Sequence, residues 1–253
     1  MKRISITALL IIILFSGAAY AQGAQSQTIP LPKIGIDIGA SDSGKDVSVT
    51  LQILLLMTVL SLAPSLMIMT TSYLRLIIVF HFLKTALGTQ QMPPSQLLAG
   101  LALFVTFFIM APTFSKINDE ALTPLMDNKI TTKEAYDKGI EPLREFMFKN
   151  TREQDLELFI GLANMSRPSS RNDIPTYILI PSFVISELRA GFIIGFFLFI
   201  PFIMVDMIVS SILLSMGMMM LPPMMISLPF KILLFILVDG WNLIIGSVVR
   251  SFQ

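Results

Sequence analysis

The sequence has no cysteine and a single histidine among its 253 residues. Disulfide bonds, thiol nucleophiles and iron–sulfur ligands are therefore excluded, and one histidine cannot form a multi-histidine metal site. Charged residues are also scarce, at 14%, and the net charge of +1 argues against nucleic acid as a partner. Most enzyme chemistry is left without support, and we expect no cofactor.

Apolar residues dominate what is present. They make up 54% of the chain, and the mean hydropathy is +0.75, which is typical of membrane proteins. The pattern predicts an all-α, membrane-associated fold of helical hairpins with about four hydrophobic helical segments after a signal peptide. These segments lie near residues 50–70, 95–114, 178–204 and 225–248, and a further apolar helix follows the first of them at residues 73–87.

The N-terminus has the pattern of a cleavable secretory signal. Lys2 and Arg3 precede an apolar run at residues 4–15, and Ala19 and Ala21 have the spacing of a cleavage site. We therefore expect residues 1–21 to be removed. An uncleaved anchor is the alternative, although the run is shorter than the about 20 residues that span a bilayer.

The mature chain is predicted to have two parts. Residues 22–46 are rich in Gly, Ser, Gln and Pro and should form a flexible N-terminal segment. Residues 47–253 should form one helical domain, with a polar helical middle region at residues 116–175. In this region Thr131 with Glu134, and Thr151 with Gln154, have the spacing of capping boxes, which predicts two helix starts.

Several charged residues lie inside the apolar segments. A charge at membrane depth costs at least about 2.5 to 3.5 kcal/mol, so such a residue normally has a partner. Glu187, Asp206 and Lys231 fall in separate elements, and we expect Lys231 to pair with Glu187 or Asp206, within or between subunits, as an assembly contact. Lys231 and Asp239 could instead extend to the interface. A proton relay is disfavoured, because only His81 titrates near neutrality without perturbation.

A second group of charged side chains lies in or beside apolar helices. We interpret these residues as helix-end, ion-pair or interface residues, because a lone histidine on an apolar helix more often packs than catalyses. They are Arg75, His81, Lys84, Arg189 and Asp239.

Methionines are concentrated in one short stretch. They are Met216, Met218, Met219, Met220, Met224 and Met225. Gly217, Pro222 and Pro223 interrupt regular helix there, which predicts a loop, and such a loop is tolerated at membrane depth where it is buried in protein or lines a pore. Because methionine is unbranched and adaptable, the cluster suggests a compliant seal. Ordinary core packing is the alternative.

Five runs of the sequence together resemble the FliP family of the flagellar type III secretion export gate. They are residues 75–80, 86–94, 181–192, 201–220 and 228–241. The runs cover most of the chain after residue 70, and their combination is far more specific than any one of them.

The resemblance implies an all-helical subunit of the bacterial inner membrane, in the flagellar basal body. Five copies would assemble with FliQ and FliR into a cone-like portal, partly on the periplasmic side, that meets other membrane proteins of the export apparatus and passes unfolded flagellar subunits. It also implies that Met218, Met219 and Met220, with Met216 beside them, form a gasket around the closed pore. The family's buried charges would correspond to Glu187, Asp206 and Lys231.

Other functions remain as alternatives. The first choice is a non-enzymatic pore subunit, because the sequence has no phosphate-binding loop that would supply energy. An injectisome export gate is a close relative of this function. A secondary transporter would show repeated halves, and none is evident. An intramembrane hydrolase would need paired acids, yet Asp206 and Asp239 are far apart in sequence and no catalytic motif accompanies them.

Overall fold

The structure is a computed structural model that describes residues 44–89, 92–166, 168–218 and 220–252. These residues contain helices and no strand, which confirms the all-α prediction. The predicted signal peptide, and the N-terminal segment as far as residue 43, lie outside the described residues. The helices are α2 (Gly44–Thr70), α3 (Tyr73–Leu87), α4 (Ser95–Ile117), α5 (Thr123–Met126), α6 (Thr132–Asn150), α7 (Glu153–Leu162), α8 (Thr176–Ser215), α9 (Pro223–Leu237) and α10 (Gly240–Arg250).

Three helical stretches among the described residues are long and apolar enough to cross a membrane. They are Thr50–Thr70, Ser95–Met126 and Thr176–Ser215, and each contains a predicted span. The fourth predicted span is a bent pair, because α9 and α10 meet at 62°. At the bend Asp239 has a φ of +48°, and a Cβ on Gly240 would lie only 2.2 Å from the Phe235 ring. The left-handed Asp239 and the close contact of Gly240 with Phe235 interrupt the helix. Hydropathy alone predicted a continuous span here.

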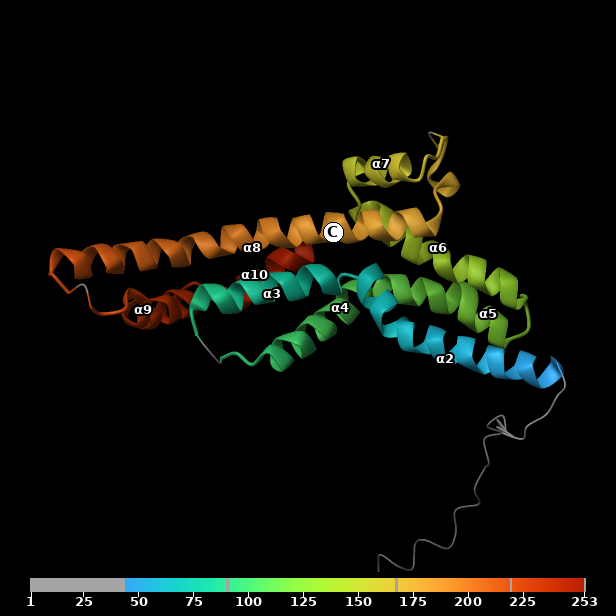
Figure 1. The fold of residues 1–253 in the computed structure, drawn as a ribbon, viewed down its shortest axis with the longest axis horizontal. Coiled ribbons are helices and arrows are strands. Elements are labelled where there is room, and N and C mark those ends of the chain that lie inside the picture. The colour runs from blue at the N-terminus through green and yellow to red at the C-terminus, as the bar shows by residue number, and fades with distance from the viewer. Residues whose placement is uncertain (1–43, 90–91, 167, 219, 253) are drawn as a thin grey trace, which may run out of the picture. The chain divides into compact units, whose positions relative to one another are not determined.

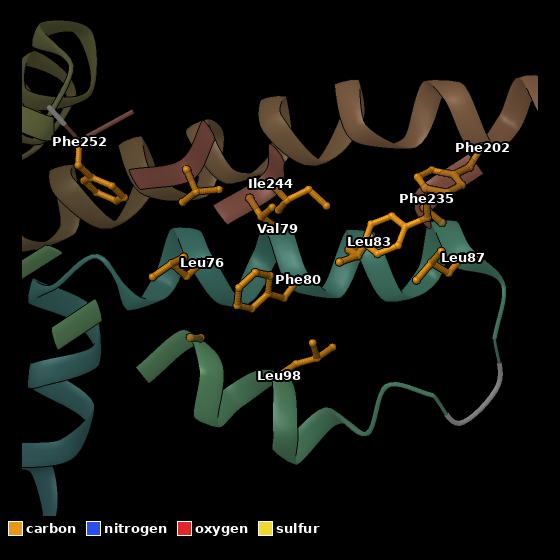
Figure 2. Packing of buried hydrophobic residues seen from close by; sticks show 13 residues of the cluster. Leu76, Val79, Phe80, Leu83, Leu87, Leu98, Phe202, Phe235, Ile244 and Phe252 are labelled. Atoms are coloured by element: carbon orange, nitrogen blue, oxygen red, sulfur yellow. The ribbon is translucent and has the colours of Figure 1, made fainter. Parts of the chain in front are cut away.

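The chain divides between Ile53 and Leu54, and every contact described below lies within the compact unit Leu54–Gln253. Its core is built around α3, which runs beside α8 (Figure 1). Leu76, Val79, Phe80 and Leu83 are fully buried, at the spacing that places residues on one helix face. They pack in a cluster with side chains from α4, α8, α9 and α10, among them Leu98, Phe202, Phe235 and Ile244 (Figure 2).

Two glycines allow α3 and α8 to approach closely. Gly191 and Gly195 are four residues apart on α8. A Cβ on Gly195 would lie 2.4 Å from the Phe82 ring, and one on Gly191 would lie 3.0 Å from Ile78. Small residues at this spacing let helices in membranes pack backbone against side chain. The pair explains why the apolar α8, without charged residues between Arg189 and Asp206, still docks on α3 in one register.

The polar middle region folds as helices that pack on the others, with α6 against α4 and α8, and α7 against α8. The first predicted capping box is present, since the Glu134 N–H donates to Thr131 Oγ1 and the Thr131 N–H donates to Glu134 Oε2. The second is wrong. Thr151 Oγ1 instead donates to the Met147 carbonyl at the end of α6, and Arg152 occupies the N-cap of α7. Thr151 is the C-cap of α6, so the N-cap of α7 falls one residue later than the sequence pattern predicted.

Candidate functional site

The methionine stretch joins α8 to α9. Helix α8 ends at Ser215, and Gly217 has a φ of +73°. The Met218 N–H donates to the Leu213 carbonyl and the Gly217 N–H to the Leu214 carbonyl, which together make a Schellman cap. Pro222 then takes the N-cap position, and Pro223 begins α9, where a missing N–H costs nothing. Both ends of the loop are therefore fixed by local backbone chemistry.

The side chains of this loop lie open. Met216 is 61% exposed, Met218 is 43% exposed and Met220 is 99% exposed. Met219 lies outside the described residues. At the start of α9, Met224 and Met225 are also exposed. These described methionines therefore do not pack in the core of this subunit. Their apolar side chains are free to contact another molecule.

Lys231 of α9 lies buried beside Asp206 of α8. Its Nζ is 2.7 Å from Asp206 Oδ2, and the whole residue is 3% exposed. Ser227 Oγ donates to the second carboxylate oxygen, Oδ1, at 2.5 Å. The sequence left open whether Lys231 pairs with Glu187 or with Asp206. In the structure Lys231 pairs with Asp206, within one subunit. The pair joins the two helices that flank the methionine loop.

The end of α3 also faces this lysine. Gly88 closes α3 with a φ of +70°, and a Cβ added to it would lie 3.6 Å from Lys231 Nζ. The ammonium thus lies near the carbonyl end of α3, where the helix dipole is negative. A buried lysine is tolerated at this place because a carboxylate and a helix end both compensate its charge.

Glu187 has a different partner from the one that the sequence favoured. Arg75 of α3 donates through Nε to Oε2 at 2.9 Å and through Nη2 to Oε1 at 2.5 Å, and both residues are buried. Such a two-pronged contact uses the planar fork of arginine, which lysine lacks. The sequence indicated Arg75 as a helix-end, ion-pair or interface residue but did not indicate Glu187 as its partner, because the pair is long-range and no spacing rule connects the two residues.

Arg75 also holds the C-terminal end of the chain. Its Nη1 donates to the Ser251 carbonyl at 3.0 Å and to Ser251 Oγ at 2.7 Å. The guanidinium carbon lies 3.7 Å from the centre of the Phe252 ring, which in turn stacks on Phe146 of α6. One side chain therefore links α3, α8 and the end of α10.

The other predicted charges lie at separate places. Lys84 Nζ donates to Ser95 Oγ, across the turn from α3 to α4. His81 is exposed at a 720 Å³ groove between α3 and α8. Arg189 is exposed at another pocket, and Asp239 is exposed at the α9–α10 bend without a side-chain cap. These residues form no common cluster.

No group of three or more His, Asp or Glu side chains that could hold a metal occurs among the described residues. The two buried ion pairs, Arg75–Glu187 and Asp206–Lys231, join neighbouring helices, and the methionine loop between α8 and α9 is open to a partner. Fold and site together define an all-helical protein with three helices able to cross a membrane, or four if the bent pair counts as one.

Comparison with known proteins narrows this class. The FliP family model matches residues 56–248. The flagellar biosynthetic protein FliP of Bacillus subtilis is 59% identical over 86% of this chain and 98% of its own length. The proteins of the same name from Caulobacter vibrioides and Borreliella burgdorferi are 45% and 44% identical, over 99% and 93% of this chain and 90% and 94% of their own lengths. The chain belongs to the FliP family.

Proposed function

We propose that this chain is a non-enzymatic, pore-forming subunit of the flagellar protein export gate, in the inner membrane of a bacterium. Several copies, five by the family resemblance, would assemble with FliQ and FliR and pass unfolded flagellar proteins. The main support is the methionine loop between α8 and α9. Its described side chains are exposed, while the end of α8 and the start of α9 hold its backbone in place. The names of the relatives support the flagellar system over an injectisome.

The apolar surface of the single subunit supports assembly. Large apolar side chains are exposed along α2, α4, α8 and α9, including Phe104, Phe108 and Phe197 at 78%, 72% and 66%. A soluble monomer rarely exposes such surface, so lipid or neighbouring subunits would cover it. Neighbours that surround a common axis would also bring the methionine loops of several copies together.

A ring of methionines suits a gate. Each side chain has several rotatable bonds and no branch, so a ring can close without one fixed fit and can reopen around an extended polypeptide. The Asp206–Lys231 ion pair links α8 and α9, the two helices that carry the methionine loop. The loop would therefore move while the two helices stay together. Opening would then be a shift between two packings of neighbouring hairpins, biased by substrate and the rest of the apparatus.

The test is to change Met218, Met219 and Met220 together to alanine, and to measure small-ion leakage and export in cells with assembly checked in parallel. We expect leakage with assembly intact. A matched control changes Met57, Met67 and Met69, which are exposed on α2, to alanine. An intact ion barrier and normal export in the loop variant would contradict the gasket.

A further inference from the structure

A pocket of 520 Å³ near the α6–α7 turn is lined by four cationic side chains. Arg75 comes from α3, Lys149 from the end of α6, Arg152 from the turn and Arg189 from α8. The pocket borders one of the most apolar helices in the chain. Because like charges gathered beside apolar surface are costly without a compensating anion, the cluster needs an explanation.

The internal carboxylates satisfy this cluster only in part. Glu187 is fully engaged by Arg75. Arg152 Nη2 donates to Gln154 Oε1, and Arg152 Nη1 forms an ion pair with Asp155 Oδ2 at 3.9 Å. That distance is too long for a hydrogen bond, and this buried Nη1 has no hydrogen-bond partner among the described residues. Arg189 has no described carboxylate within ion-pair distance. The Arg189 guanidinium and the Nη1 of Arg152 can therefore still receive an anion at this pocket.

An apolar pocket adjoins the cationic one, and two residues line both. Ile193 and Ile194 line both the cationic pocket and a second pocket of 460 Å³ formed by α8, α9 and α10, where Phe197 and Leu234 also contribute. No charged residue occurs on α8 in residues 190–205, a stretch of about 24 Å. One ligand with an anionic end and a long apolar body would fit both parts.

We propose that these two adjoining pockets together bind an anionic phospholipid, with its phosphate at Arg152 and Arg189 and an acyl chain along α8 past Ile193. Arginine forks match phosphate oxygens in two-pronged contacts, and basic pockets between membrane helices suit acidic headgroups. A free phosphate would leave the apolar pocket unused. A zwitterionic lipid would bring a second cation to a site that already has an excess of them.

The proposal is tested on the full chain, purified in detergent from membranes. Native mass spectrometry counts the lipids retained when phosphatidylglycerol, phosphatidylcholine or glycerol phosphate is added. Phosphatidylglycerol should be retained roughly tenfold or more better than phosphatidylcholine, and glycerol phosphate should not bind. The double variant Arg152→Gln with Arg189→Gln should lose the preference. Lys133→Gln with Lys138→Gln, which makes the same charge change on the exposed face of α6, should retain it.

Several results would overturn the proposal. Equal retention of the two lipids would remove the phosphate contact, and loss of retention in the α6 control would show a general charge effect. Binding of glycerol phosphate as strong as that of the lipid would make the pocket a free-phosphate site. If the native chain retained no lipid, the proposal would be wrong, and an acidic protein partner would be the remaining candidate for the pocket. Arg189→Gln alone, at an exposed residue, provides a readout should the double variant fold poorly.

Discussion

Arg75 and Glu187 are separated by more than one hundred residues in sequence, yet they form a two-pronged, buried ion pair between α3 and α8. Removal of one charge would leave the other buried and uncompensated. We expect Glu187→Gln to lower the free energy of unfolding by about 3 to 5 kcal/mol, and Arg75→Lys to be poorly tolerated because lysine cannot form the fork. Thermal unfolding of the purified chain in detergent measures both effects.

Two comparisons make this result specific. The double variant Arg75→Met with Glu187→Leu removes both charges and should be less destabilised than either single variant. Lys116→Met breaks the exposed pair with Glu145 and should cost no more than about 1 kcal/mol. A Glu187→Gln protein as stable as the native chain would show that this pair contributes little.

Lys231 offers a second prediction, on assembly. Lys231→Ala should lower recovery of the assembled complex more than it lowers expression of the subunit, because Asp206 and the hairpin that carries the methionine loop lose their link. Ser227→Ala removes only one hydrogen bond to Asp206 and should have a smaller effect. Recovery is measured by affinity purification from membranes, and recovery of the Lys231 variant at the native level would contradict the prediction.

Charge exchange can decide whether the functional pair forms within one subunit. Asp206→Lys and Lys231→Asp in the same chain should restore recovery that each single reversal loses. If instead the two single reversals restore assembly only when expressed together, the pairing that matters is between subunits. Within the described subunit, the 2.7 Å contact predicts restoration by the double variant.

The sequence was sufficient for the local features of the fold. Hydropathy located the apolar segments, and Gly217 with Pro222 and Pro223 located the break between α8 and α9. Thr131 with Glu134 predicted a true capping box. Each of these follows from neighbours in sequence, where the backbone and a few adjacent side chains decide the outcome.

What the sequence could not supply is long-range. From the sequence, Glu187 and Asp206 were both possible partners of Lys231. Only three-dimensional packing shows that Glu187 pairs with Arg75. The hydropathy of residues 225–248 concealed the bend, because the left-handed Asp239 and the contact of Gly240 with Phe235 carry no hydropathy signal. The spacing of Gly191 and Gly195 was the one readable signal for helix packing that sequence reasoning missed.

The capping box of α6 gives a pH prediction. The backbone N–H of Thr131, and then its hydroxyl, hydrogen-bond the Glu134 carboxylate and hold its pKa below the ordinary glutamate value. Because the folded pKa is lower than the unfolded one, the stabilisation is present above the unfolded pKa and is lost as pH falls through the folded pKa. Amide hydrogen exchange in the first turn of α6 should therefore lose protection in acid.

Thr131→Ala is the matched comparison for this effect. Without the hydroxyl the first turn of α6 should be less protected at neutral pH, and its protection should depend less on pH across the glutamate range. Exchange is followed by mass spectrometry of the peptide that contains Glu134, with a peptide from α3 as the internal reference. An unchanged pH dependence in Thr131→Ala would assign the effect to another group.

Gly195 tests the close approach of α3 and α8. A Cβ there would lie 2.4 Å from the Phe82 ring, so Gly195→Ala should force the ring or the helices apart and cost about 1 to 3 kcal/mol. Gly100→Ala on α4 is the control, because a Cβ there meets nothing within 4 Å and alanine favours a helix by up to about 1 kcal/mol. Opposite shifts of the thermal unfolding midpoint are therefore expected. Adding Phe82→Leu should partly restore the stability of the Gly195→Ala variant, because the smaller side chain makes room for the new Cβ. Equal shifts of the unfolding midpoint in the two glycine variants would show that helix propensity, not packing, controls this position.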